Sequence, residues 1–149
     1  MVLYRATFIV AILALVSASV SLPGAATSGT RVPTKVGPPS QQYVMAFHGC
    51  KTGSGDCNNP SSHEVYLAQS NDGASWSLVP GWEPRDGSVP DVFRRGDTLY
   101  VISTGGVSRL NMQTGDVTHE KVTIEGGENY VDPSLAQLPD GRLVMFYLP

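Results

Sequence analysis

From Tyr43 onward the chain alternates short β-rich segments with tight-turn signals, and this alternation limits its possible folds more than any other feature. No window in this part sustains apolar residues at positions i, i+3, i+4 and i+7, the spacing of an amphipathic helix. The 149 residues include 16 Gly and 11 Pro, a larger share than the ~12% of an average protein. The sequence therefore excludes a helical bundle and predicts an all-β sandwich, barrel or propeller.

The clearest unit lies between residues 89 and 122, where four strands are predicted in succession. They are expected at 89–94, 98–103, 107–110 and 117–122, with turns at 96–97 and 105–106 and a polar loop at 111–116. Glycine at these turns can adopt the positive φ that tight hairpins need. Four strands joined in order by hairpins form a β-meander, which is the shape of one propeller blade.

Parts of this unit recur on both sides of it. Downstream, strands at 131–137 and 143–148 flank a Pro-Asp-Gly turn, and Asp91 and Asp132 stand 41 residues apart at strand starts. That interval matches the period of propeller blades, about 40–50 residues. Upstream, strands at 43–47, 64–69 and 76–79 fit the second, third and fourth strands of an earlier blade. The sequence thus predicts a partial β-propeller of about two and a half four-stranded antiparallel blades, at approximately 43–82, 88–124 and 130–149.

The N-terminus has the composition of an export signal. Residues 6–30 carry no charge, and an apolar run at 6–20 follows Arg5. A short positive end, an apolar centre and a small-residue exit are typical of a secretory signal peptide. Both Ser19 and Ala26 are suitable cleavage points, and we assign 1–26 to a signal helix. The alternative is an uncleaved membrane anchor, although the run is shorter than the ~20 apolar residues of a spanning helix.

The signal predicts a secreted protein, extracellular or periplasmic, with no membrane contact once the signal is cleaved. Residues 27–42 contain three Pro and two Gly without a hydrophobic period, and are predicted to be a linker. Ten Lys and Arg against thirteen Asp and Glu give a net charge of -3. Nothing in this balance would neutralise a phosphate backbone, so no nucleic-acid partner is expected.

The chain has two cysteines, Cys50 and Cys57, separated by six residues rich in Gly and Ser. In an exported protein such a pair predicts a disulfide. His48 and His63 lie close by in the sequence, so a Cys2His2 zinc site is the alternative. The spacing matches no familiar zinc finger, and we expect neither a metal nor a cofactor.

The segment 70–76, Ser-Asn-Asp-Gly-Ala-Ser-Trp, resembles the Asp-box (BNR repeat) of sialidases and related propellers, with one residue fewer between Asp and Gly. The resemblance implies structural roles for Ser70, Asp72, Gly73 and Trp76. The carboxylate would accept backbone N–H groups and glycine would adopt positive φ. The Trp76 ring would be buried against the next strand. An ordinary Asn-Asp-Gly hairpin before an aromatic residue is the alternative.

Two further segments, 88–100 and 130–135, resemble the strand starts of arabinanase-like and invertase-like furanosidase propellers. The resemblance implies that Asp91 and Asp132 face a central channel as catalytic residues, one as general base and the other as an orienting residue that modulates its pKa. Glycoside hydrolysis needs two carboxyl groups with different protonation states. The alternative is structural, because Asp beside Pro is also a common turn former.

Together these features predict an exported, glycan-directed propeller: a sialidase-like or furanosidase-like glycoside hydrolase of the exo-glycosidase type, with a carbohydrate substrate. The alternative is a non-catalytic propeller module that binds carbohydrate or a surface. The furanosidase resemblance would place the acid Glu on a later blade, beyond residue 149. We therefore expect the remaining blades to be missing from this chain, and the chain alone to be inactive.

Overall fold

The computed structural model describes residues 35–127 and 129–149. The predicted signal peptide and residues 27–34 of the predicted linker lie outside the described residues. The elements are β1 (Tyr43–Cys50), the 3-10 turn η1 (Pro60–Ser62), β2 (His63–Ser70), β3 (Ser77–Leu78), β4 (Arg85–Asp86), β5 (Asp91–Arg95), β6 (Thr98–Ser103), β7 (Gly106–Asn111), β8 (Val117–Glu120), β9 (Val131–Gln137) and β10 (Leu143–Leu148). The described part contains no α-helix, and the all-β prediction is confirmed.

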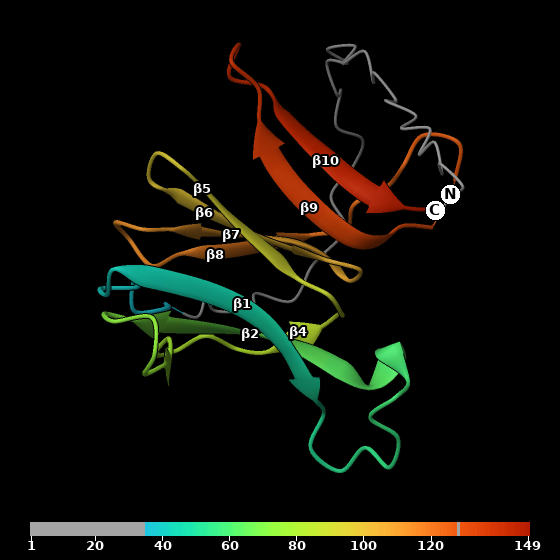
Figure 1. Ribbon diagram of the computed structural model, residues 1–149, viewed down its shortest axis with the longest axis horizontal. Helices are drawn as coiled ribbons and strands as arrows, with labels where there is room; N and C mark the ends of the chain where they lie inside the picture. Colours follow the sequence, from blue (N-terminus) through green and yellow to red (C-terminus); the bar gives the residue numbers. More distant parts are fainter. Residues whose placement is uncertain (1–34, 128) are drawn as a thin grey trace, which may run out of the picture. The chain divides into compact units, whose positions relative to one another are not determined.

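Strands β5, β6, β7 and β8 pair in chain order as one four-stranded antiparallel sheet (Figure 1). This confirms the meander predicted from the sequence, and β6 has the predicted bounds. Successive side chains of a strand point to opposite faces, so Leu99 and Val101 of β6 lie on one face, and both are buried. A second sheet contains β1 to β4, and β9 pairs with β10 in a separate hairpin.

The edge of the β1–β4 sheet is interrupted. Strands β3 and β4 both pair with β2, but the register shifts by four residues between the two pairings. The shift accommodates a bulge at residues 79–84. Within it, the Val79 N–H donates to the Leu67 carbonyl (2.9 Å), and the Trp82 indole N–H donates to the Val65 carbonyl (3.1 Å). The sequence did not predict β4, because two residues after a Pro-Gly bulge leave no alternating pattern.

The hydrophobic core lies between the first two sheets. Val65 and Leu67 of β2 pack in one cluster with Leu99 and Val101 of β6 and with Leu110 of β7. Alternation along each strand directs these residues to the same side.

Residues 35–42, in the predicted linker, make specific contacts with this core. Val36 is only 4% exposed and belongs to the same cluster. Its N–H donates to the Gly115 carbonyl (2.8 Å), and the Gly37 N–H donates to the Pro80 carbonyl (2.9 Å). The packed region thus begins before the first strand.

Candidate functional site

The start of β5 and the middle of β9 are joined by the carboxylate of Asp91. Its Oδ2 accepts hydrogen bonds from the Ser134 hydroxyl (3.0 Å) and the Leu135 N–H (2.8 Å). Its Oδ1 accepts the N–H of the next residue, Val92 (2.8 Å). Oδ2 therefore joins β5 to β9 while Oδ1 is engaged within β5, and this structural contact was not evident from the sequence.

Asp132 differs from Asp91 in both exposure and conformation. It is exposed, and its carboxylate has no hydrogen bond or ion pair to any other residue in the described part of the chain. Its φ is 49°, in the left-handed region that few residues other than glycine adopt. Backbone strain of this kind is concentrated at functional sites, so Asp132 is the carboxylate here with the features of a ligand-contacting group.

Val89 provides a counterpart to Asp132. These two are the non-glycine residues with positive φ in the described chain, with φ 47° and 49°. Each directly precedes a proline, Pro90 or Pro133, at the start of a strand. Backbone conformation therefore aligns Val89 with Asp132, 43 residues apart, and Asp91 with Ser134. The sequence-based alignment, in contrast, paired Asp91 with Asp132, 41 residues apart, because it matched residue type rather than backbone conformation.

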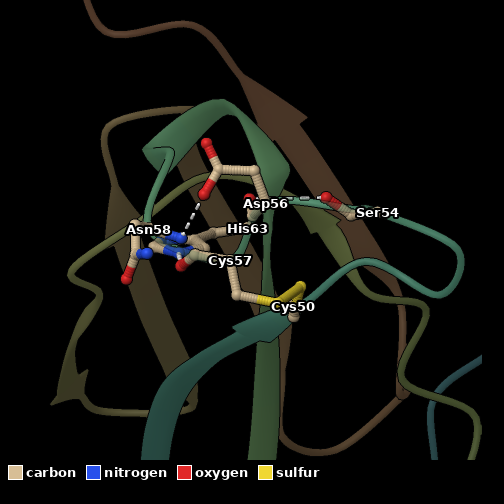
Figure 2. The surroundings of a disulfide bond; sticks show 6 residues. All are labelled: Cys50, Ser54, Asp56, Cys57, Asn58 and His63. Carbon is tan, nitrogen blue, oxygen red and sulfur yellow. Dashed lines mark hydrogen bonds between the residues drawn. A yellow bond between two sulfur atoms is a disulfide. The ribbon is translucent and has the colours of Figure 1, made fainter.

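Two stacked histidines adjoin the start of β5. The Val89 N–H donates to Nδ1 of His48 (3.2 Å). The imidazoles of His48 and His63 stack with ring centroids 4.4 Å apart and planes at 11°. His63 in turn has its Nδ1 2.8 Å from the Ser88 hydroxyl. Its Nε2 lies 2.9 Å from the carbonyl oxygen of Cys57, which Figure 2 shows beside it. The sequence placed both histidines near the cysteines but gave no sign that their rings stack.

The disulfide predicted between Cys50 and Cys57 is confirmed (Figure 2). It closes the loop between β1 and β2, whose base is also held by the Lys51 N–H donating to the Ser62 carbonyl (2.8 Å). Both sulfurs are bonded to each other, so the alternative Cys2His2 zinc site is not formed. Across residues 35–127 and 129–149, no group of three His, Cys, Asp or Glu side chains is arranged to hold a metal ion.

Reduction of this disulfide is expected to lower the free energy of unfolding by about 2.5 kcal/mol, because the bond restricts a short loop in the unfolded chain. Urea denaturation with and without dithiothreitol would measure the difference. A Cys50→Ser/Cys57→Ser variant, which has no bond to reduce, should give the same curve in both conditions. Identical wild-type curves with full reduction verified by thiol titration would contradict the expectation.

The turn that resembles an Asp-box is a compact hydrogen-bonded unit. The Ser70 hydroxyl oxygen accepts the N–H groups of Asp72 (3.2 Å) and Gly73 (2.8 Å). Oδ1 of Asp72 accepts those of Ala74 (2.8 Å) and Ser75 (2.7 Å). Gly73 has φ 72°. Asp72 and Gly73 thus behave as the sequence suggested.

Trp76, in contrast, is not buried. It is 39% exposed, and its indole N–H donates to the Gly73 carbonyl within the turn (3.1 Å). The prediction of a core position was wrong, because this local hydrogen bond holds the side chain at the surface. Trp82 is the tryptophan that packs, half-buried, against the hydrophobic core.

A second turn has the same hydrogen-bond pattern without the same sequence. Oδ1 of Asn111 accepts the N–H groups of Gln113 (2.8 Å) and Thr114 (3.0 Å), two and three residues ahead. Ser70 makes the corresponding bonds 41 residues earlier. Each of these residues ends a strand, β2 or β7. The similarity of the two turns was not evident from the sequence, because an Asn amide oxygen in one and a Ser hydroxyl oxygen in the other accept the corresponding N–H bonds.

The hydrogen bonds from the Ser75 and Ala74 N–H groups and the Ser70 hydroxyl lower the pKa of Asp72 from its ordinary 3.8 to about 2. A carboxyl whose pKa is lower in the folded state stabilises the fold above its unfolded pKa, and loses that contribution as pH falls through the folded value. The destabilisation caused by Asp72→Asn should therefore be constant from pH 7 to 5 and shrink between about pH 4 and 2. Thermal melts across this range would measure it. Asn71→Ala, at the uncharged neighbour, should show no such dependence.

Within the described ranges, no helix has the length and apolar character required to cross a membrane. Comparisons of the chain with models of known families, with curated proteins and with solved structures gave no significant match.

Proposed function

We propose that this chain is part of an exported, glycan-directed β-propeller whose sugar site lies at the starts of β5 and β9. Antiparallel sheets that follow one another in chain order support this proposal. Strand β1 lies against β5, and β9 lies against β5 and β6 (Figure 1). A propeller is built from such sheets, each packed on the next.

Repeated contacts between successive sheets also support it. The end of β1 meets the start of β5 through the bond from the Val89 N–H to His48. In the same way, the end of β6 meets the segment before β9, where the Tyr130 hydroxyl donates to the Ser103 carbonyl (2.9 Å). Since both β1 and β6 end at the segment that precedes the next sheet, β1 corresponds to β6, which is the second strand of the β5–β8 sheet. The similar turns at Ser70 and Asn111 follow the third strands, β2 and β7, in the same scheme.

The observation that carries the functional proposal is the exposed carboxylate of Asp132, held with a left-handed backbone and without a partner among the described residues. In a glycoside hydrolase of the sialidase-like or furanosidase-like kind, this group would act on the sugar as base or nucleophile. Asp91 would orient the strand that carries it through its bonds to Ser134 and Leu135. The disulfide supports export, because such bonds persist in oxidising compartments.

One observation favours the second candidate, a propeller that binds carbohydrate without cleaving it. Hydrolysis requires two carboxyl groups at the scissile bond. At the starts of β5 and β9, Asp91 uses both of its oxygens within the protein. Asp132 is thus the one carboxylate of these two that is available to a ligand.

A direct test uses the full-length protein with two pairs of probes. Hydrolysis is assayed on 4-methylumbelliferyl sialoside and p-nitrophenyl arabinofuranoside, and binding is assayed by titration calorimetry with sialyllactose and arabinotriose. Hydrolysis of either the fluorogenic sialoside or the chromogenic arabinofuranoside would support the glycosidase. Binding without hydrolysis would support the carbohydrate-binding alternative. The absence of both binding and hydrolysis would overturn the glycan-directed proposal for these sugars.

A further inference from the structure

We infer that His48 donates a hydrogen bond to the bound sugar, and that the Cys50–Cys57 disulfide positions it through His63. This inference rests on the proposed function and adds a residue from β1 to a site otherwise built from β5 and β9.

The tautomer of His48 follows from its backbone partner. The Val89 N–H can only donate, so Nδ1 of His48 must be the unprotonated acceptor of that 3.2 Å bond. In the neutral ring the proton then lies on Nε2. His48 is exposed, and its Nε2 has no hydrogen bond to any residue in the described ranges. The ring therefore presents one N–H donor of fixed identity to the solvent.

His63 cannot serve the same purpose, because both of its nitrogens are engaged. Nε2 faces the Cys57 carbonyl, which only accepts, so Nε2 carries a proton; Nδ1 faces the Ser88 hydroxyl. These two bonds fix the plane of the ring on which His48 stacks at 4.4 Å. The two histidines thus have separate tasks: His63 positions the ring of His48, and His48 is available to a ligand.

The disulfide belongs to the same chain of contacts. The Cys57 carbonyl that accepts from His63 lies in the loop whose position the bond to Cys50 fixes (Figure 2). Breaking the bond would release this carbonyl, and with it the orientation of both rings.

The neighbours of His48 identify the chemistry of its ligand. Its Val89 partner lies two residues before Asp91, which bonds to Ser134 of β9, two residues after Asp132. A neutral N–H donor near the end of β1 and an acceptor carboxylate near the start of β9 complement sugar hydroxyl groups, each of which both accepts and donates. A neutral, fixed donor does not require a charged ligand group, so uncharged sugars suit the site as well as acidic ones.

The first test is His48→Phe, which keeps a flat ring to stack on His63 but removes the donor. In the full-length protein, its dissociation constant for sialyllactose or arabinotriose, whichever binds the wild type, should rise about tenfold, the usual effect of one lost hydrogen bond. His119→Phe, at a histidine of β8 that bonds to Ser108, should bind as the wild type does. Matching melting temperatures would show that the fold is retained.

The positioning role is tested by coupling. Cys50→Ser/Cys57→Ser should weaken binding severalfold in the wild-type background and have no further effect in His48→Phe, because it acts through His48. Equal effects in both backgrounds would overturn this part of the inference. Nitrogen-15 NMR of the unliganded protein should show the His48 proton on Nε2, and a proton on Nδ1 would contradict the assignment.

The outcomes separate the two proposals. If Asp132→Asn loses binding while His48→Phe retains it, the role of His48 is wrong and the glycan site stands. If the wild type binds neither sugar, the proposed function and this inference fail together.

Discussion

The glycosidase activity proposed for the full-length protein is expected to fall about a thousandfold when Asp132 is replaced by Asn, the size of effect that follows loss of a general base. Asparagine keeps the shape of the side chain and one acceptor oxygen but cannot take up a proton or act as a nucleophile. It is also among the residues that best tolerate positive φ. The free energy of unfolding should therefore change by no more than about 0.5 kcal/mol. Turnover of the 4-methylumbelliferyl and p-nitrophenyl glycosides and urea denaturation would measure the two quantities.

Asp140→Asn is the matched control for this experiment. Asp140 is also exposed, but it lies in the turn between β9 and β10, where it pairs with Arg142 (2.8 Å). The pKa of Asp140 is lowered, chiefly by the hydrogen bond from the Arg142 backbone N–H, because its carboxylate is engaged within the turn. Activity should survive its replacement. Equal activity in Asp132→Asn and wild type would remove Asp132 from the catalytic assignment.

The largest expected loss of stability follows Leu110→Ala. Leu110 is 0% exposed and packs in the cluster between the first two sheets. Truncation of a fully buried leucine leaves a cavity and removes apolar contacts, which typically costs about 3–5 kcal/mol. Urea denaturation should show the midpoint shifted strongly to lower denaturant, with the slope little changed.

Leu78→Ala makes the same chemical change at a leucine that is 57% exposed on β3. Its effect should stay within about 0.5 kcal/mol, as for most surface substitutions. Similar losses for the two variants would mean that the core does not lie where these contacts place it.

Local sequence signals predicted most of the strands, because alternating apolar residues and turn glycines act over a few neighbouring positions. The strands at 98–103, 131–137 and 143–148 have the predicted bounds. The disulfide could be predicted for the same reason, since its two cysteines are only seven positions apart in the sequence.

The candidate site was less predictable because it depends on contacts between distant segments. Asp91 bonds to residues more than 40 positions away, and no local pattern could reveal that its carboxylate is occupied. The left-handed backbone at Val89 is also set by tertiary context, since a β-branched side chain strongly disfavours it. No local sequence pattern indicated that Trp82, and not Trp76, packs against the core.

The bulge beside β2 has a consequence for how the chain can change over evolution. Three carbonyls along β2 accept hydrogen bonds from the bulge and from the residue after β4: those of His63, Val65 and Leu67 accept from the Gly87 N–H, the Trp82 indole N–H and the Val79 N–H, respectively. A side chain thus replaces one backbone donor, and the pairings of β3 and β4 on either side are anchored independently. Insertions or deletions between residues 79 and 85 that keep the indole in place would leave every one of these acceptors satisfied. Relatives of this chain are therefore expected to vary in length at this bulge while they retain a tryptophan within it.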